Sequence, residues 1–600
     1  MCGILFSISD TRPENSPLWN SLEALNTKRG PDAQQTHVIT IQDQQAQLYL
    51  RFFSSVLHLR GDHVVPQPMT PATGDVLSWN GEIFGGLEIT LGENDTEVLV
   101  RRLAGISPTD TSEKAVLDIL TQIEGPFAFV FWQAHTNRLW FGRDCLGRRS
   151  LLWARSKSLT NKSFMLSSVG PSSASSDSGS DNVVWEEVPA DGLYCIQMED
   201  IETETTDESV FGHPIRHFSW VQQENSGPNT LPLPFPLINR YVPKDLSVDT
   251  REGEPVVDGE METAIEEFTL VLSESVRRRV ADVPSLGPIE ACARVAILFS
   301  GGLDCITLAA LAHQHLPHCE PIDLLNVAFE NPRREQALQK PKKSKNKKKH
   351  NDVEVTEESS TALDQQPVIQ TINIYDTPDR VTGRAGVAEL RKIAPERIWN
   401  FVEINVPYPE AMSHKQRIIE LMYPLDTVMD LSIAMAFWFA SRGEGTIDDN
   451  GNTKPYHSRS RVLLSGLGAD EQLGGYSRHK DAFRRGGWDK VIEETQMDVD
   501  RISTRNLGRD DRIMSDHGKE VRFPFLSTDV VNWLCRCPIY IKMDLRYERG
   551  IGEKLLLRNV ARRLGLSEAS KNWKRAIQFG AKTAKMTDSS RSEKGQHKLS

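Results

Sequence analysis

The sequence predicts a two-domain protein, with an α+β domain followed by an α/β domain. Short β-type runs separated by turn-forming residues fill positions 2–197. A helix with one buried stripe follows, because apolar residues recur every three or four positions from Met261 to Val280. Strands and helices then alternate at crossover spacing, a pattern typical of a parallel sheet with helices on both faces.

In the first domain, over 2–197, each expected strand is a short apolar run bounded by turn signals. These runs lie at 4–8, 48–57, 76–84, 128–132 and 138–142. A Ser-rich patch at 172–180 predicts a loop. Residues 198–260 carry acidic side chains and the Pro-rich segment LPLPFPL, so we expect an extended linker.

In the second domain, over 261–586, strands are expected at 295–299, 324–329 and near 401–406, with a helix at about 305–316. An insert at 331–366 is basic in its first part and acidic in its second. This composition predicts a disordered surface loop, and a nuclear-import patch is the alternative interpretation. The tail at 587–600 is expected to be disordered.

Composition excludes several classes of protein. A hydrophobic content of 39% and a charged content of 25% over 600 residues are typical of a soluble globular protein. The net charge of −12 argues against a general nucleic-acid binder. No apolar run reaches the length of a membrane span, and no secretory signal is visible. Since the 8 cysteines lack paired spacing, we expect no disulfide framework and a cytoplasmic location.

The first candidate site begins at Cys2. Removal of Met1 would place a thiol and a free α-amine on one residue, and the amine can act as base for the thiol. Taken alone, Cys2 is better explained as a buried structural cysteine. Asn80 and Gly81 suit a hairpin turn, and Asp95 suits a helix cap. Other polar residues in or beside the expected strands of this domain are Arg60, Glu82, Arg143 and Asp144, and Arg60 is also explained as a solvated strand residue.

Together and in order, the segments KRGPD, LHLRGD, VLSWNGEIF, ENDTEVL and FGRDCLGRRSLLW resemble the class II glutamine amidotransferase domain. This is an N-terminal-nucleophile hydrolase, and the resemblance over 2–190 implies an αββα sandwich. It implies that Cys2 attacks the amide carbon of glutamine while Asn80 and the N–H of Gly81 hold the oxyanion. The glutamine-binding residues that it implies are Arg60, Asn80, Gly81, Glu82 and Asp95.

The second candidate site is a strand, glycine turn and helix at VAILFSGGLDC, residues 295–305. Gly301 and Gly302 would let backbone N–H groups approach a polyphosphate, Ser300 offers a hydroxyl, and Asp304 suits Mg²⁺. A plain α/β turn explains the glycines equally well. The sequence contains neither a Walker motif nor G-x-G-x-x-G after a strand, so we exclude both of those phosphate sites.

A second glycine-rich turn lies at RVLLSGLGADEQLGGY, residues 461–476. Ligands of parallel sheets bind beyond the carboxyl ends of strands, where both turns could face one phosphate group. Asp470 and Glu471 suit a metal or an adenylate, although as an isolated feature such a pair is more often a helix N-terminal cap with an acidic first turn. We expect Asp304 and Asp470 to be the metal pair.

SGGLDC resembles the S-G-G-x-D-S signature of N-type ATP pyrophosphatases, and SGLGADEQLGGY resembles the signature of asparagine synthetases. Segments 511–527 and 552–566 match further blocks of the latter family in order. The chain therefore resembles a glutamine-dependent asparagine synthetase, whose second domain is a doubly wound parallel-sheet ATP pyrophosphatase. The implied ATP- and pyrophosphate-binding residues are Phe299, Ser300, Gly301, Gly302, Asp304, Cys305, Val327, Ser465 and Gly466. The implied acyl-adenylate residues are Leu467, Asp470 and Glu471.

The resemblance implies ATP, Mg²⁺, glutamine, and aspartate or a related small carboxylic acid. In the family's reaction, ATP adenylates the aspartate side chain and releases pyrophosphate. Ammonia then arrives through an internal tunnel from the glutamine site and displaces AMP. The two domains must therefore stay docked over a sizeable buried interface.

The chain departs from the family at several positions. Leu467 stands in place of a glutamate, Cys305 in place of a serine, and Ala576 in place of a phosphate-binding lysine, with Lys574 and Arg575 nearby. In the first domain, GDH at 61–63 replaces an apolar run and Ser150 replaces a proline.

Two hypotheses follow from these departures. The chain is a glutamine-dependent amide ligase whose synthetase step they would weaken, or a catalytically degenerate scaffold that retains glutamine or nucleotide binding. RNA-modifying pyrophosphatase activity is disfavoured, because a fused amidotransferase points to a small carboxylic acid.

Overall fold

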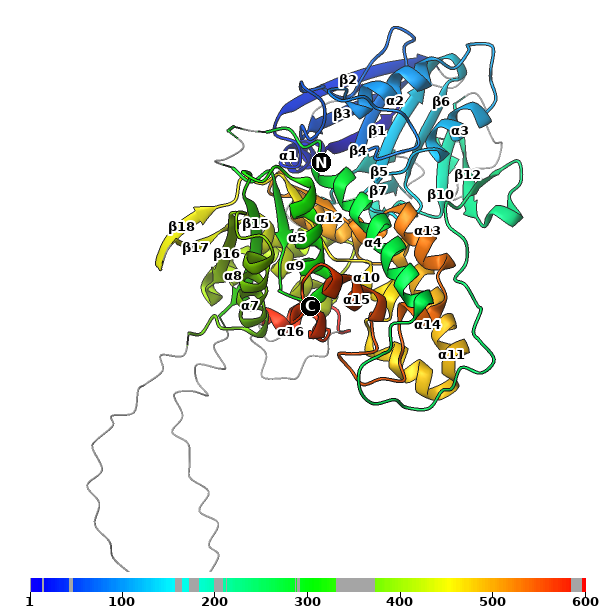
Figure 1. Cartoon of the computed structure of the whole chain (residues 1–600). Helices are drawn as coiled ribbons and strands as arrows, with labels where there is room; N and C mark the ends of the chain where they lie inside the picture. Colours follow the sequence, from blue (N-terminus) through cyan, green and yellow to red (C-terminus); the bar gives the residue numbers. More distant parts are fainter. Residues whose placement is uncertain are drawn as a thin grey trace, which may run out of the picture.

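The computed structural model describes residues 2–12, 16–42, 47–156, 164–171, 183–198, 209–211, 213–285, 287–288, 292–330, 373–449, 451–583 and 596–599. The expected loop at 172–180, the expected insert at 331–366 and most of the expected tail lie outside these residues. The described chain forms two packed domains, and its N-terminus lies at their boundary (Figure 1).

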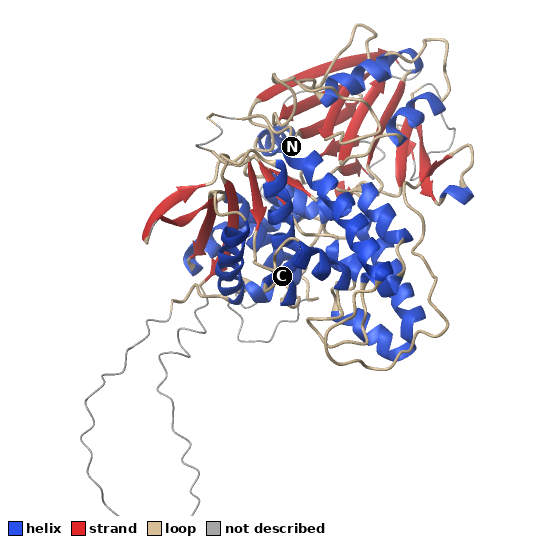
Figure 2. Cartoon of the chain, in the orientation of Figure 1, coloured by secondary structure: helices blue, strands red, loops and turns tan. Residues whose placement is uncertain are grey.

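The first domain stacks two largely antiparallel sheets between helices (Figure 2). Their orders are β2-β3-β1-β8-β7-β9 and β11-β12-β10-β6-β5-β4. Alternate residues of facing strands, such as Phe6 and Val130, fill the core between the sheets. Trp19 of α1 packs on the outer face of the first sheet, and Leu99 of α2 and Val116 of α3 pack on the outer face of the second. The layers are therefore helix, sheet, sheet, helix.

The elements of this domain match the predicted strands closely. They are β1 (Gly3–Ser9), α1 (Pro17–Thr27), β2 (Ala33–Gln42), β3 (Gln47–Val56), β4 (Val76–Gly81), α2 (Asp95–Ala104), α3 (Lys114–Thr121), β5 (Phe127–Gln133), β6 (Arg138–Arg143), β7 (Leu152–Ser156), β8 (Phe164–Ser167), β9 (Val183–Glu187), β10 (Gly192–Gln197), β11 (Ser209–Val210), β12 (His213–Val221) and β13 (Thr230–Pro232).

The structure differs from the expected linker over 198–260. Strand β12 pairs with β10, and β13 pairs with β12, so the second sheet continues beyond residue 197. Phe218 and Leu231 join the core on the helix-covered face of that sheet. The acidic and Pro-rich composition of the segment hid these short strands, which are stabilised by long-range pairing.

The second domain is built on a seven-stranded sheet of order β18-β17-β16-β15-β14-β19-β20. Strands β16, β15, β14, β19 and β20 are parallel, and the β17–β18 hairpin adds an antiparallel edge. Val295 and Ile297 of β14 pack against one helix layer, whereas Ala296 between them packs against the other. Helices therefore cover both faces, as predicted.

The chain leaves β14 in one direction toward β15 and β16 and later returns on the other side as β19 and β20. This makes the gap between β14 and β19 a topological switch point. The principal elements are α4 (Gly259–Val280), β14 (Val295–Leu298), α5 (Leu303–His315), β15 (Ile322–Phe329), α7 (Pro378–Ile393), β16 (Trp399–Val406), α8 (Tyr408–Met422), α9 (Val428–Arg442), β17 (Glu444–Asp449), β18 (Asn452–His457), β19 (Val462–Leu464), α10 (Ala469–Leu473), α11 (Ser477–Asp500), α12 (Leu507–Ser515), β20 (Glu520–Arg522), α13 (Thr528–Arg536), α14 (Ile539–Lys542), α15 (Leu555–Arg563) and α16 (Ile577–Gly580).

Part of the expected disordered tail is ordered against α9. The His597 carbonyl accepts from the N–H of Val428 at 2.9 Å, and the Leu599 N–H donates to the Asp426 carbonyl at 2.7 Å. In the described part of the chain, no helix combines the length and the apolarity that crossing a membrane requires.

Buried arginines join the two domains. Arg29 pairs with Asp511 at 2.6 Å, and the Arg149 guanidinium pairs with Glu520 at 2.9 Å. Arg148 also donates to the Leu526 carbonyl at 2.8 Å. Because charged groups tolerate burial only when paired, these contacts fix the relative position of the domains.

Candidate functional site

The first candidate site is a small cavity around Cys2, at the start of β1. The Cys2 N–H donates to Oδ1 of Asn80 at 3.0 Å, and Arg29 donates to the Cys2 carbonyl at 3.2 Å. Two side chains from distant parts of the sequence thus hold the backbone of Cys2. Its thiol is buried, and burial raises the pKa of Cys2 above the ordinary value.

The side-chain amide nitrogen of Asn80 is not used in hydrogen bonding within the described residues. This atom, Nδ2, is buried. An unsatisfied buried donor costs about 1–3 kcal/mol, so this amide nitrogen is free to donate to an acceptor that reaches it beside Cys2. Asn80 and Gly81 end strand β4, which pairs with β5. The hairpin-turn interpretation of these two residues was therefore wrong.

Gly81 is required by close packing. A Cβ there would lie 2.6 Å from the Pro126 carbonyl oxygen, a distance that no side chain tolerates.

Gln67 also lies beside Cys2, and sequence reasoning missed it because no motif marks it. Its Nε2 lies 3.8 Å from Cys2 Sγ, and its Oε1 accepts from the Trp79 N–H at 2.7 Å.

Arg60, Glu82 and Asp95 line the same cavity as Cys2 and Gly81. Arg60 donates to the Ile83 carbonyl, and the Ile83 N–H donates to Asp95 at 3.0 Å. Asp95 opens α2, but the capping residue is Asn94 rather than Asp95. Asp95 is buried, and burial raises its pKa.

A second-domain residue, Glu520, also lines the cavity around Cys2, and the sequence did not mark it. The Arg522 guanidinium lies between two buried carboxylates, 2.6 Å from Glu520 and 3.2 Å from Glu82. Burial raises the pKa of Glu82 to about 8, although the Arg522 guanidinium opposes the shift. The first site is therefore completed by the second domain.

The second candidate site is a cavity of about 480 Å³. It lies where β14 and β19 end, at the switch point of the sheet. All the predicted ATP and acyl-adenylate residues except Gly301 line it, namely Phe299, Ser300, Gly302, Asp304, Cys305, Val327, Ser465, Gly466, Leu467, Asp470 and Glu471. The two glycine-rich turns thus meet in one place, as predicted.

Glycines allow the two turns to approach each other. Gly301 has φ +74°, and a Cβ there would lie 2.4 Å from the Thr382 backbone. A Cβ on Gly466 would lie 2.7 Å from the Asp304 Cβ. The thiol of Cys305 donates to the Gly302 carbonyl at 3.2 Å, and burial raises its pKa to about 11. Cys305 therefore supports its own turn as a neutral thiol.

Asp304 and Asp470 converge on one cation. The Lys554 ammonium lies 2.7 Å from Asp304 and 2.6 Å from Asp470, and Lys574 pairs with Asp470 as well. Burial alone would raise the pKa of Asp470, but the two lysines hold it below the ordinary value. Lys554 lies in the recognised block 552–566, yet sequence reasoning did not select it.

These carboxylates fit Mg²⁺ only together with a nucleotide. Within the described ranges, no three His, Cys, Asp or Glu side chains gather closely enough to hold a metal. Two convergent carboxylates fit Mg²⁺ when phosphate oxygens and water supply its remaining ligands.

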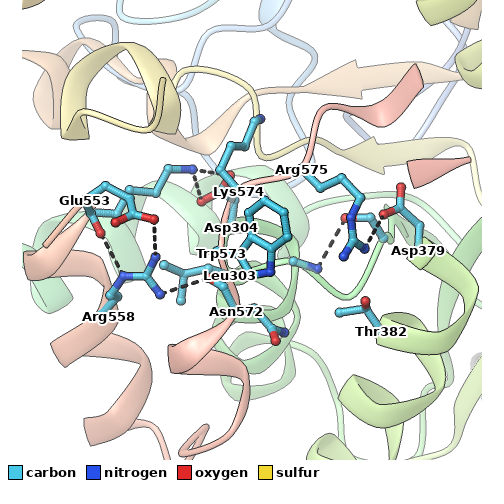
Figure 3. A pocket seen from close by; sticks show the side chains of 13 residues that line it. Leu303, Asp304, Asp379, Thr382, Glu553, Arg558, Asn572, Trp573, Lys574 and Arg575 are labelled. Atoms are coloured by element: carbon cyan, nitrogen blue, oxygen red, sulfur yellow. Dashed lines mark hydrogen bonds and ion pairs between the residues drawn. The ribbon is translucent and has the colours of Figure 1, made fainter. Parts of the chain in front are cut away.

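A smaller adjoining pocket, which shares Asp304, Asp379 and Lys574 with this cavity, carries further cationic side chains. Arg575 lies 3.7 Å from Asp379, and Arg558 lies 3.3 Å from Glu553, on opposite sides of the view in Figure 3. Asp379, which the sequence did not select, has a side chain only 8% exposed, and burial raises its pKa to about 7 although Arg575 opposes the shift. Buried charge in a cleft is typical of a functional site.

Comparison with known proteins identifies both domains. The family model described as glutamine amidotransferase domain matches residues 1–176, and the one described as asparagine synthase matches residues 484–592. A Gallus gallus protein named asparagine synthetase domain-containing protein 1 is 40% identical over 100% of this chain and 99% of its own length. The chain belongs to the asparagine synthetase domain-containing protein family.

The Homo sapiens protein of the same name is 39% identical over 98% of this chain and 95% of its own length. A Methanocaldococcus jannaschii protein, putative asparagine synthetase [glutamine-hydrolyzing] 1, is 42% identical over 84 residues, or 14% of this chain and 16% of its own length. The expected fusion is confirmed: members of the asparagine synthetase domain-containing protein family join an amidotransferase domain to an asparagine synthase domain.

Proposed function

We propose that this chain is a glutamine-dependent amide ligase. It hydrolyses glutamine at Cys2 and uses the ammonia, with ATP, to convert aspartate or a related small carboxylic acid into an amide. Its first domain acts as an N-terminal-nucleophile hydrolase and its second as an N-type ATP pyrophosphatase. The observation that carries the proposal is the pairing of Cys2 with an Asn80 amide whose Nδ2 finds no acceptor among the described residues.

At the glutamine site, the α-amine of Cys2 takes the thiol proton once Met1 has been removed. The thiolate attacks the amide carbon, and Asn80 Nδ2 and the Gly81 N–H stabilise the oxyanion. The C–N bond breaks, ammonia leaves with the proton, and water hydrolyses the thioester to glutamate. Arg60 and Asp95 hold the carboxylate and the ammonium of glutamine.

At the second site, the turns at 300–302 and 465–466 hold ATP. A carboxylate oxygen of the acid attacks the α-phosphorus, and pyrophosphate leaves. Ammonia attacks the acyl carbon, AMP leaves with the bonding electron pair, and one proton is released. Lys554 and Lys574 offset the charge of the phosphates. Mg²⁺, held by Asp304 and Asp470, would offset more of this charge.

Leu467 favours a second function, that of a scaffold which binds nucleotide without synthesis. A leucine at this position supplies neither a base nor a charge. The nearby Glu471 accepts a hydrogen bond from the Tyr476 hydroxyl at 2.5 Å, and burial raises its pKa.

The two functions are separated by incubating the protein with glutamine, ATP, Mg²⁺ and a set of carboxylic acids. Glutamate, pyrophosphate and amide are then measured independently. A ligase forms all three, and Cys2→Ala loses glutamate formation while added ammonia restores the amide. Glutamate without acid-dependent pyrophosphate would favour the scaffold.

A further inference from the structure

One wall of the ATP cavity is apolar and open. Met429, Ile433 and Phe437 are spaced four residues apart on α9, so they share one face of that helix. All three line the cavity, and Met429 is 44% exposed. A catalytic cavity that keeps partly exposed apolar side chains is shaped for an apolar part of a ligand.

Three other elements complete this wall. Leu298 comes from the end of β14, Leu467 follows Gly466, and Ile577 begins α16. Leu467 stands beside the phosphate turn, because Gly466 packs against the Asp304 Cβ. The wall therefore borders the place where an acyl-adenylate would form. The resemblance to asparagine synthetases places adenine against Phe299 and Val327, which line the same cavity but are not part of this wall.

The arginines of the cavity already have carboxylate partners. Arg505 lies 3.7 Å from Glu471 and 3.5 Å from Asp498, and Arg509 lies 2.6 Å from Asp430.

Arg478, which also lines the cavity, pairs with Asp498 and, at 3.1 Å, with Glu494. A second charged group on the acid, such as the α-carboxylate of aspartate, would compete with these carboxylates for the arginines. Lys574 also lines the cavity and also pairs with a carboxylate, Asp470. The proposed reaction itself requires one carboxylate of the acid beside the phosphates, so we assign Lys574 to that reacting group.

We infer that the acyl acceptor is a monocarboxylic acid with an apolar body, rather than aspartate. This inference rests on the proposed function and specifies its substrate. The carboxylate lies toward Lys574 and attacks the α-phosphorus of ATP, releasing pyrophosphate. The hydrocarbon part lies against Ile433, Phe437 and Leu467. Attack of ammonia on the acyl carbon then gives the amide, AMP and one proton.

The sharpest probe is 3-methylbutanoate, which replaces the ammonium and α-carboxylate of aspartate by two methyl groups. Acid-dependent pyrophosphate release is measured for both acids, and for straight-chain acids of four to eight carbons. Since one methylene in an apolar pocket changes kcat/KM about 10–200-fold, we expect the best apolar acid to exceed aspartate by at least about tenfold.

Two variants test the wall itself. Leu467→Glu should lower kcat/KM for the apolar acid at least about tenfold, whereas Leu467→Met should retain the preference over aspartate. Ile433→Thr, on a separate element, should lower kcat/KM for the apolar acid without a matching loss of ATP affinity in calorimetry. A thermal melt of each variant confirms that it is folded.

The outcomes distinguish this inference from the function on which it rests. Pyrophosphate release with aspartate but with no apolar acid would leave the ligase in place and overturn the inference. Release with no acid of either kind, while ATP binds and glutamine is hydrolysed, would overturn both.

Discussion

The glutamine cavity and the ATP cavity differ in how completely each is built. Around Cys2, the predicted residues converge, and the Asn80 Nδ2 has no acceptor among the described residues. In the second cavity, the turns converge equally well, but Leu467, Cys305 and Ala576 replace polar groups of the synthetases that this chain resembles. Both regions therefore bring the predicted residues together, while under the proposed function the groups that would assist chemistry are better kept in the first.

The largest expected effect on activity comes from substituting Asn80, beside Cys2. Asn80→Ala removes the donor for the oxyanion and should lower kcat for glutamine hydrolysis about 10²–10³-fold. Asn80→Asp keeps an acceptor for the Cys2 N–H but lacks the donor, so it should lose activity too. Glutamate formation measures both. An active Asn80→Asp variant would show that the amide donor does not act on the oxyanion.

In the ATP cavity, Asp304→Asn should weaken nucleotide binding. Loss of one charged ligand typically costs about 1.5–3 kcal/mol, which is about 10–150-fold in affinity. Calorimetry of ATP with Mg²⁺ and with EDTA measures the effect, which should be confined to the titration with Mg²⁺. Equal affinity of wild type and variant in both titrations would mean that Asp304 holds no metal.

A smaller effect separates the two glycines of the phosphate turn. Gly301→Ala forces a side chain to φ +74° and against Thr382, so it should destabilise the domain by about 1–3 kcal/mol. Gly302→Ala is the matched control, because φ is −70° and the nearest atom, Ser300 Oγ, lies 3.2 Å from its Cβ. Urea denaturation compares them, and equal losses would contradict the strain argument.

The smallest effect concerns pH. Glu82 and Asp379 have pKa values raised by burial to about 8 and about 7. Between the ordinary pKa of each carboxyl group and its raised pKa in the folded state, the folded state binds more protons than the unfolded state. The free energy of unfolding therefore falls as pH rises through this window. Glu82→Gln and Asp379→Asn should therefore gain stability relative to wild type as pH rises from 5 toward the raised pKa, on the order of 1 kcal/mol per pH unit. Urea midpoints that shift in parallel with wild type would refute this.

Sequence periodicity predicted most elements that carry the sites. The predicted strands at 295–299 and 324–329 correspond to β14 and β15, and the predicted helix from Met261 corresponds to α4. These predictions succeed because burial on one or both faces leaves a local pattern in the chain. Strand β12 was missed because its stability comes from pairing with β10 rather than from its own composition.

The sequence by itself determined which residues could do chemistry: Cys2, the two glycine-rich turns and their carboxylates. Only the tertiary structure decided which of them meet. Lys554 reaches Asp304 across 250 positions, and Glu520 closes the cavity of Cys2 from the other domain. Such contacts follow from strand order and domain docking, because packing of distant segments leaves no periodic signal in either segment alone. The apolar wall of α9 and Leu467 is likewise visible only once both face one cavity.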